Sequence, residues 1–435
     1  MVDGAFEKLH PALQHHIVNT LGWSDLRPLQ REAIEPVLRG DDALLLAPTA
    51  AGKTEAALFP LLTRMAESSW QATSVLYVCP LRALLNNLEP RLATYAAWLG
   101  RSAAVRHGDT KQSERRRMAI EHPDILLTTP ESLEAMLVSG VTDPRVLLAN
   151  VRAVVIDEVH AFAGDDRGWH LLALLARTND LVGRPMQRVG LSATVGNAPE
   201  LLAWLQGGHR EAQRSVIDSG RTTGVAPEVE VDYVGSLANA AKVVASLHQG
   251  EKRLVFAETR ANVETLASHL RELGTETYVS HSSLAADERR RAERAFAEAR
   301  NCVIVSTSTL ELGIDVGDLD RVIQVGAPQT VASVLQRLGR TGRRSGTTRN
   351  LLFLATTDEE LVRAAALTML WGEGYIEPVV PPPKPRHLLA QQLLALALQK
   401  HQLGIHLGGS VRRAGPGLAR GDDRDNRLDA ADRTS

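Results

Sequence analysis

Short apolar runs alternate with helical stretches along the first half of the chain. Each run is rich in leucine or β-branched residues and ends near Pro, Gly or Asp, which is typical of strands in a parallel sheet covered on both faces. The pattern therefore predicts a doubly wound α/β domain. Its strands are expected at Ala43–Leu46, Val75–Cys79, Ile125–Thr128, Val151–Ile156 and Arg188–Leu191.

A second series of the same kind begins after the polar and Gly-containing stretch from His209 to Gly224. The two halves share one strand–helix rhythm, although the sequence shows no repeat of fixed period. Two α/β domains of similar size are therefore expected in tandem. The strands of the second domain are predicted at Arg253–Ala257, Thr277–Ser280, Cys302–Ser306, Arg321–Val325 and Asn350–Ala355.

Helical patterns flank the two series. An amphipathic helix is expected over Phe6–Leu21, and a second one ends near Gly40. Towards the other end, Glu359–Trp371 and His387–Leu403 also have helical patterns, and the proline-rich stretch Pro378–Pro385 breaks the chain between them.

The last residues have a different composition. From residue 404 onward Gly, Arg and Asp dominate, and 420–435 contain almost nothing to bury, so we expect disorder there. The expected divisions are an N-terminal helical lead-in over 1–31, a first domain over 32–212, a linker over 213–227, a second domain over 228–372 and a partly disordered tail over 373–435.

Composition limits the kinds of partner that the protein can bind. The 435 residues carry a formal net charge of −2 and only 4% aromatic residues. A nucleic-acid surface would therefore depend on local patches and backbone amides instead of overall basicity. Cys79 and Cys302 are the only cysteines and form no Cys-x-x-Cys pair, which argues against zinc, iron–sulfur and disulfide chemistry. With no signal peptide or membrane-length apolar run visible, we expect a cytoplasmic protein that does not enter a membrane.

The stretch Leu46–Glu55 follows the first predicted strand and precedes a helical sequence. Strand, loop and helix are the context that a phosphate-binding loop requires, whereas a chance Gly-Lys-Thr is the alternative. Backbone N–H groups of such a loop point at the β- and γ-phosphates, with Lys53 on their oxygens and the Thr54 hydroxyl on Mg²⁺. The loop residues expected to hold nucleotide are Ala47, Thr49, Ala50, Ala51, Gly52, Lys53 and Thr54.

Asp157 and Glu158 come directly after the apolar run Val151–Ile156. A carboxylate at a strand end beside a phosphate loop can hold Mg²⁺, and its neighbour can orient or deprotonate the attacking water. We assign the first role to Asp157 and the second to Glu158. Acidic residues at a strand end often only face solvent, but their position after a phosphate loop favours the catalytic interpretation.

A basic stretch, Gln336–Arg344, lies in the second predicted domain. A solvated basic turn would explain its arginines but not the two glycines between them. We expect Arg340 and Arg343 to reach across the cleft to the γ-phosphate, as arginine fingers do. Their contact would then form only when the two domains close.

In this order the motifs resemble those of superfamily 2 DEAD/DEAH-type helicases, and among these the Lhr (large helicase-related) family. Leu191–Asn197, Leu310–Asp315 and the Asp-Glu-Val-His box favour Lhr over the DEAD-box RNA helicases. The remaining similarities are Gln30 with Trp23 to the adenine-reading Q motif, Pro80–Leu84 to motif Ia, Thr128–Leu133 to motif Ib, Ser192–Thr194 to motif III, Thr307–Asp315 to motif V and the basic stretch to motif VI.

The resemblance implies two RecA-like domains that use ATP and Mg²⁺ to move along single-stranded DNA or RNA. Duplexes or DNA–RNA hybrids with a single-stranded tail are further possible substrates, 3′ to 5′ movement is implied, and a role in DNA repair is compatible. It adds Gln30, Gly313 and Asp315 to the nucleotide site, Ser192, Thr194 and Gln336 as coupling residues, and Arg82, Thr128, Thr129 and Thr309 as nucleic-acid contacts. Contacts to phosphates would make binding independent of base sequence.

Two features depart from the family pattern. Ala50 stands where the family usually has Gly, which costs about 1 to 2 kcal/mol if that position needs a positive φ. Lhr relatives also continue with a winged-helix domain. Because 373–435 are too few residues for a complete domain of this kind, we expect them to hold only its incomplete start.

Three functions stay open at this point. The first is a helicase or translocase, and the second is a nucleic-acid-stimulated ATPase that remodels complexes but unwinds duplexes poorly, as a short tail would imply. The third is a catalytically weak clamp in which Ala50 has disabled turnover. The presence of Lys53, Thr54, Asp157, Glu158, Arg340 and Arg343 argues against the clamp. The sequence indicates neither the oligomeric state nor the choice between DNA and RNA.

Overall fold

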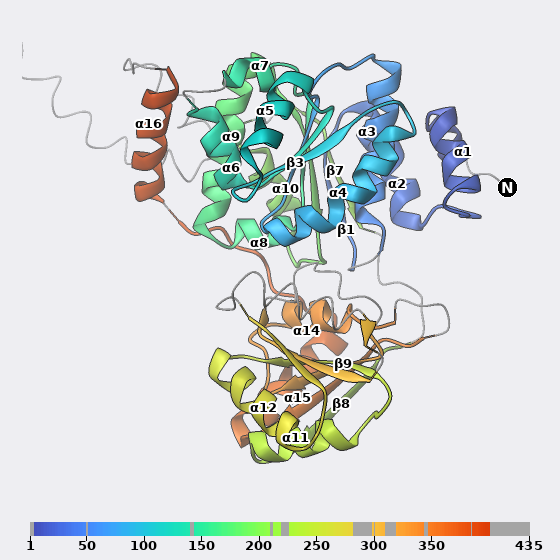
Figure 1. Ribbon diagram of the computed structural model, residues 1–435, viewed down its shortest axis with the longest axis vertical. Coiled ribbons are helices and arrows are strands. Elements are labelled where there is room, and N and C mark those ends of the chain that lie inside the picture. Colours follow the sequence, from blue (N-terminus) through green and yellow to red (C-terminus); the bar gives the residue numbers. More distant parts are fainter. Residues whose placement is uncertain are drawn as a thin grey trace, which may run out of the picture.

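The computed structural model consists of two α/β bodies, each built around one parallel sheet (Figure 1). This confirms the predicted fold class. The residues that the structure describes are 4–48, 51–139, 143–208, 212–218, 226–281, 298–299, 301–308, 319–342, 347–383 and 385–400.

The first sheet has seven strands in the order β3-β4-β2-β5-β6-β1-β7, and every pairing is parallel. Leu45 and Tyr77 belong to the core on one face of the sheet, and Leu44 and Leu76 to the core on the other. The strands are β1 Asp42–Leu46, β2 Val75–Val78, β3 Ala103–Arg106, β4 Ile125–Thr128, β5 Ala153–Ile156, β6 Gln187–Ser192 and β7 Arg214–Asp218.

Helices cover both faces of this sheet, as the continuous apolar strands require. Helices α2, α3 and α4 contribute to one core, and α6 to α10 contribute to the other. The helices are η1 Phe6–Lys8 (3₁₀), α1 Pro11–Asn19, α2 Pro28–Arg39, α3 Lys53–Glu67, α4 Arg82–Ala97, α5 Gln112–Glu121, α6 Pro130–Leu137, α7 Pro144–Leu148, α8 Val159–Ala163, α9 Asp166–Val182 and α10 Ala198–Gln206.

The second sheet has six parallel strands in the order β10-β11-β9-β12-β13-β8. Its strands are β8 Glu228–Tyr233, β9 Lys252–Ala257, β10 Thr277–Ser280, β11 Cys302–Ser306, β12 Arg321–Val325 and β13 Asn350–Ala355. Its helices are α11 Leu237–Ser246, α12 Arg260–Glu272, α14 Val331–Leu338 and α15 Asp358–Gly372, and α16 Arg386–Lys400 follows. None of the helices within the described ranges has the length and apolar character needed to cross a membrane.

The pattern of apolar runs did not predict β3, β7 and β8, because these are edge strands whose side chains, except Ile217, are half-exposed or exposed. Strand β7 lies within the segment expected as a linker, 213–227, yet it pairs with β1 along its whole length. The first sheet therefore extends past residue 212.

The amphipathic segment at the N-terminus is also divided. It forms the short helix η1 and then α1, which begins at Pro11 because proline suits the first helical position, where a backbone N–H has no intrahelical partner. The ring of His10 caps α1 by accepting a hydrogen bond from the Ala12 amide (3.2 Å).

Helix α16 packs against α9 of the first body (Figure 1). The contact is built around Arg177, which is fully buried and donates to Glu134 and to Gln392 and Gln399 (both 2.9 Å). Gln392 in turn donates to Glu134 (2.7 Å). The helix that we predicted within the tail is therefore joined to the first domain through a buried polar network.

This network predicts a pH-dependent term in stability. Burial alone would raise the pKa of Glu134, but hydrogen bonds from His170 and Gln392 and the charge of Arg177 outweigh it and lower the pKa to about 2. The folded-state pKa is below the ordinary 4.5, so the stabilisation is complete above that value and is lost as the pH falls towards 2. The unfolding free energy of wild type minus that of Glu134→Gln should shrink by about 2 kcal/mol between pH 5 and pH 3.

Chemical denaturation at both pH values measures this difference. The matched control is Glu121→Gln, because the Glu121 side chain is 65% exposed. If the stability advantage of wild type over Glu134→Gln stayed constant down to pH 3, the folded protein would not lower the pKa of Glu134 and the prediction would be wrong.

Candidate nucleotide and nucleic-acid site

The phosphate loop leaves β1 and enters α3 through Gly52, whose φ of +83° is in the left-handed region. A Cβ at Gly52 would also lie 2.3 Å from Nε2 of Gln30, so two separate constraints require glycine. Lys53 Nζ donates to the carbonyl oxygens of Ala47 (2.6 Å) and Pro48 (3.2 Å). Ala51 is half-buried, and Thr49 and Ala50 lie outside the described residues.

Gln30, the residue expected to read adenine, is buried beside this loop. Its Oε1 accepts a hydrogen bond from the Arg27 amide (3.0 Å), and its Nε2 donates to the carbonyl of Gly52 (3.4 Å). The predicted adenine reader therefore also supports the conformation of the phosphate loop.

Asp157 and Glu158 follow β5, at the carboxyl end of the sheet, where the phosphate loop also lies. Asp157 Oδ2 accepts from the Tyr77 hydroxyl (2.9 Å), and Oδ1 accepts from the Glu158 amide (3.0 Å). Burial and the charge of Glu158 raise the pKa of Asp157 to about 6, against the influence of Lys53. Burial lowers the pKa of Lys53, and both carboxylates oppose that shift. The three predicted groups therefore share one largely buried site.

The side-chain oxygens of Thr54 and Asp157 suit a hard divalent cation, which prefers oxygen ligands. Tyr77 contacts both Thr54 and Asp157 through its hydroxyl, so the two oxygens expected to serve Mg²⁺ lie on either side of one phenol. Thr54 also accepts a hydrogen bond from Arg91 of α4 (3.2 Å). Within the described ranges no group of three or more His, Cys, Asp or Glu residues could hold a metal, so nucleotide phosphates would have to supply further ligands.

His160 connects this site to the second domain. The Nδ1 atom of its ring lies 3.0 Å from Oγ of Ser192. Its Nε2 atom lies 2.9 Å from the side-chain amide nitrogen of Gln336 in α14 and 3.5 Å from the carboxylate of Glu158. Burial, with the charge of Lys53, lowers the pKa of His160 to about 4, so the imidazole is neutral at pH 7. His160 was not among the predicted site residues, although it is the last residue of the Asp-Glu-Val-His box. Thr194 is half-buried in the loop that follows Ser192, the last residue of β6.

Arg340 follows α14 and is almost fully buried. Its positive charge contributes to the lowered pKa of Lys53, which places it near the phosphate loop of the other domain. Arg337 anchors α14 to the second sheet by pairing with Glu258 (2.8 Å) and stacking on Phe256 at 4.9 Å. Arg343 lies outside the described residues.

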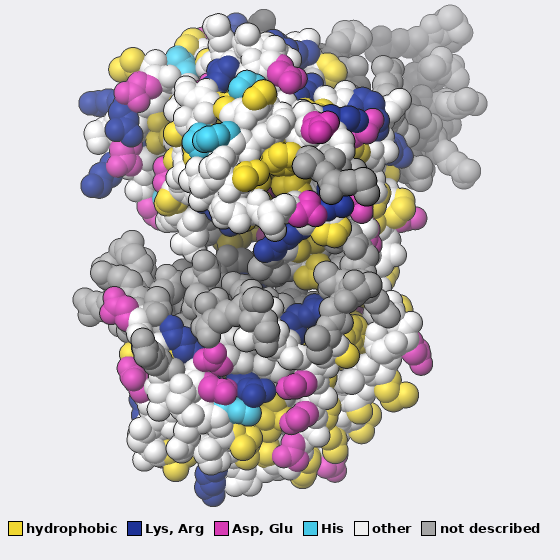
Figure 2. Space-filling view, turned by 90° about the vertical axis from the view of Figure 1, so that its right-hand side faces the viewer, with side chains coloured by type: hydrophobic (Ala, Val, Ile, Leu, Met, Phe, Trp, Pro, Cys, Tyr) yellow, Lys and Arg dark blue, Asp and Glu magenta, His cyan; other side chains and the backbone are white. Residues whose placement is uncertain are grey.

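The residues expected to contact nucleic acid differ in exposure. Arg82 begins α4, is 54% exposed and pairs with Asp109 (2.8 Å). Thr128 and Thr129 are buried: the Thr128 hydroxyl donates to the Arg106 carbonyl (2.8 Å), and Thr129 caps α6. Thr309, Gly313 and Asp315 lie outside the described residues. Figure 2 shows that basic and acidic side chains are interspersed among the described residues of the face turned to the viewer.

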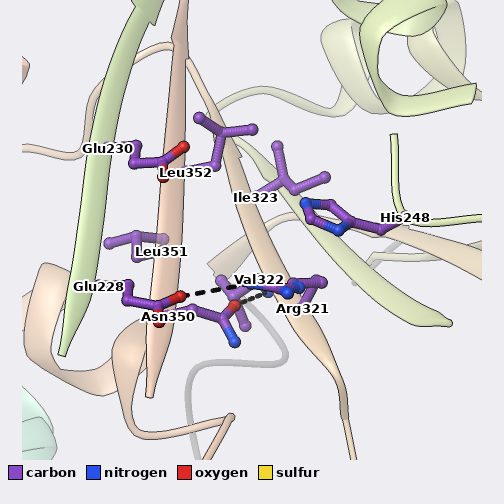
Figure 3. A pocket seen from close by; sticks show the side chains of 9 residues that line it. All are labelled: Glu228, Glu230, His248, Arg321, Val322, Ile323, Asn350, Leu351 and Leu352. Atoms are coloured by element: carbon purple, nitrogen blue, oxygen red, sulfur yellow. Dashed lines mark hydrogen bonds and ion pairs between the residues drawn. The ribbon is translucent and has the colours of Figure 1, made fainter. Parts of the chain in front are cut away.

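A separate pocket lies in the second domain, at the amino-terminal halves of β8, β12 and β13 (Figure 3). Its volume is about 60 Å³. Arg321 at the edge of the pocket pairs with Glu251 (3.1 Å) and Glu228 (3.6 Å), so the positive charge of Arg321 is already neutralised. The pocket is remote from the carboxyl strand ends that carry the nucleotide residues.

The two domains and their facing residues have the architecture of a superfamily 2 helicase core. Residues 27–202 match the family model of the DEAD/DEAH box helicase, and residues 236–345 match that of the helicase conserved C-terminal domain.

The chain belongs to the Lhr family of these helicases. It is 32% identical, over 89% of its length, to the Lhr helicase/probable uracil glycosylase of Mycolicibacterium smegmatis. It is 31% identical, over 90% of its length, to the ATP-dependent helicase Lhr-Core of Methanothermobacter thermautotrophicus. The solved structure of Mycobacterium smegmatis Lhr bound to ssDNA and AMP-PNP has a TM-score of 0.83 at 31% identity, covering 95% of this chain and 56% of that one. The chain spans 29% and 49% of the two relatives' lengths.

Glu158 has a φ of +52°, in the left-handed region that L-residues with a side chain seldom adopt. Such strain is common at functional sites and costs about 1 to 3 kcal/mol. Glu158→Gly should therefore be more stable than Glu158→Ala by about 1 kcal/mol in chemical denaturation, although both remove the carboxylate. At Arg116, an exposed position within α5, the order should reverse, with Gly below Ala by about 1 kcal/mol. Equal stability of the two Glu158 variants would show that the site imposes no backbone strain.

Proposed function

We propose that this chain is the motor of an ATP-dependent helicase or translocase that acts on single-stranded DNA or RNA. The observation that supports this most directly is the contact across the two domains. Gln336 contacts His160, and the charge of Arg340 acts on Lys53, which supports a site that residues of the second domain would complete. A site divided in this way can couple hydrolysis to domain motion.

The proposed roles combine the geometry of the described residues with the positions of the remaining residues in the sequence motifs. Amides of Ala47, Thr49, Ala50, Ala51 and Gly52 would hold phosphates, with Lys53 on the β/γ oxygens and Gln30 near the adenine. Thr54 and Asp157 would hold Mg²⁺, which neutralises phosphate charge when bound. Glu158 would orient and deprotonate the attacking water. Arg340, with Arg343, would stabilise the negative charge that develops on the γ-phosphate. From the family pattern, Gly313 and Asp315 would contact nucleotide, and Ser192 and Thr194 would couple the two sites.

For nucleic acid, we propose phosphate contacts through Arg82 and, from the family pattern, Thr309. Thr128 and Thr129 are buried, so their proposed contribution is to shape the loop and not to grip phosphates directly. Support for a single-stranded substrate comes from Lhr of Mycobacterium smegmatis, which was solved bound to ssDNA. The two cysteines, buried and not bonded to each other, support a reducing compartment such as the cytoplasm.

Two variants separate nucleotide binding from hydrolysis. Glu158→Gln should keep ATP affinity within about threefold and reduce kcat by at least a hundredfold, because only the activation of water is lost. Lys53→Ala should weaken ATP binding as well. Equilibrium binding of a fluorescent ATP analogue and steady-state ATPase rates with single-stranded DNA provide the two measurements. Wild-type turnover in Glu158→Gln would remove Glu158 from its proposed role.

Arg82 offers a test of the nucleic-acid surface. Arg82→Ala should weaken binding of single-stranded DNA of any sequence and reduce the slope of log K against log salt by about 0.7, as expected when one phosphate contact to a single strand is lost. Arg363→Ala is the matched control, because Arg363 pairs with Glu359 on the outer helix α15. A strand-displacement assay on the wild type distinguishes a helicase from an ATPase that only remodels complexes. An unchanged salt slope in Arg82→Ala would contradict the phosphate contact.

A further inference from the structure

We propose that Glu377 is a positioning residue that holds the helix carrying Gln336 against the first domain. Glu377 lies in the segment 373–383, called here the strap, which leaves α15 and leads to α16 (Figure 1). The structural part of this proposal stands by itself, whereas its effect on hydrolysis rests on the proposed function.

The Glu377 carboxylate caps α14. One oxygen accepts from the Val331 amide (2.7 Å) and the other from the Ala332 amide (3.1 Å). Thr330 accepts from the Ser333 amide (3.1 Å), so together the two side chains satisfy the first three N–H groups of the helix. The negative charge at the amino end also complements the helix dipole. Glu377 is distant in sequence from α14, so this cap fixes the strap to the second domain.

The same strap is fixed to the first domain. The Glu377 carbonyl accepts from the Gly196 amide (3.3 Å), and the Asn197 side chain forms two hydrogen bonds with the backbone of Val379 (2.8 and 3.0 Å). A Cβ at Gly196 would lie 2.3 Å from the Ile376 carbonyl oxygen, so the strap and this loop are in direct contact. Trp169 continues the attachment by donating to the Pro382 carbonyl (2.7 Å).

Glu377 therefore joins two elements that the nucleotide site requires. Its main chain binds the loop that directly follows Ser192 and Thr194, and its side chain binds the helix that brings Gln336 to His160 and leads to Arg340. Arg337 holds the other end of α14 on its own sheet. With one end fixed by Arg337, the cap at the other end determines how the helix meets the first domain.

An ordinary helix cap would change only stability, whereas a positioning residue changes the geometry of the closed state. Glu377→Ala should lower kcat for ATP about tenfold with KM within threefold, because the lost contacts orient groups that act mainly in the transition state. Glu377→Gln keeps an acceptor oxygen and should fall between wild type and Glu377→Ala. Glu373→Ala, an exposed change in the same strap, should behave as wild type.

Gly196→Ala and Asn197→Ala test the other side of the strap without touching the cap. Gly196 has no positive φ, so alanine there acts only by crowding the Ile376 carbonyl. Both variants should reproduce the fall in kcat. Should Glu377→Ala fail to fold, as judged by its melting curve, these two variants and Glu377→Gln carry the test.

The domain arrangement is measured without turnover by energy transfer between dyes at Glu121→Cys and Glu272→Cys, both exposed. We expect the strap variants to broaden the interdomain distance distribution in the presence of AMP-PNP and single-stranded DNA. Wild-type kcat and wild-type distances in Glu377→Ala, Gly196→Ala and Asn197→Ala would overturn the proposal. A wild type that hydrolyses no ATP would instead refute the proposed function, and the distance measurement would still decide the role of Glu377.

Discussion

The contact between His160 and Gln336 is the interaction on which the arrangement of the site depends. A neutral imidazole has one donor and one acceptor nitrogen, so it can serve Ser192 on one side and Gln336 on the other. Burial, together with the positive charge of Lys53, keeps the ring neutral by lowering its pKa to about 4. Lys53, which we propose binds phosphate, thus also helps to keep His160 neutral, and His160 is the residue that contacts Gln336 of the second domain.

Parallel sheets explain why the functional residues gather where they do. The phosphate loop follows β1, Asp157 follows β5, and Ser192 ends β6. All of them therefore lie at the carboxyl ends of the strands of the first sheet. The second domain contributes the helix α14, which follows β12 in its own sheet. Neither sheet alone assembles both sets of groups, and the strap is a described segment that contacts both domains beside the site.

Sequence patterns identify the parts of this protein that local chemistry determines. The buried strands and the groups Lys53, Asp157 and Glu158 are visible because apolar runs and motif spacing mark them. Edge strands such as β7 escape because their side chains are exposed. Tyr77 reads as an ordinary core residue within an apolar run, and Glu377 lies next to a proline-rich break. Their partners, Asp157 and α14, are far away in sequence, so only the folded chain shows what they do.

The electrostatics of the site also indicate how nucleotide binding can drive a conformational change. Lys53 is partly buried and donates to two loop carbonyls, so a phosphate must compete with those contacts for its ammonium group. Burial makes the charged forms of both Lys53 and Asp157 costly, and each group partly relieves the other. A bound phosphate would bring negative charge close to Lys53 and Arg340, which lie on different domains. Under the proposed roles, the attraction of both cations to one anion would favour closure of the two domains. The neutral His160 contact would let the domains meet there without adding a further buried charge.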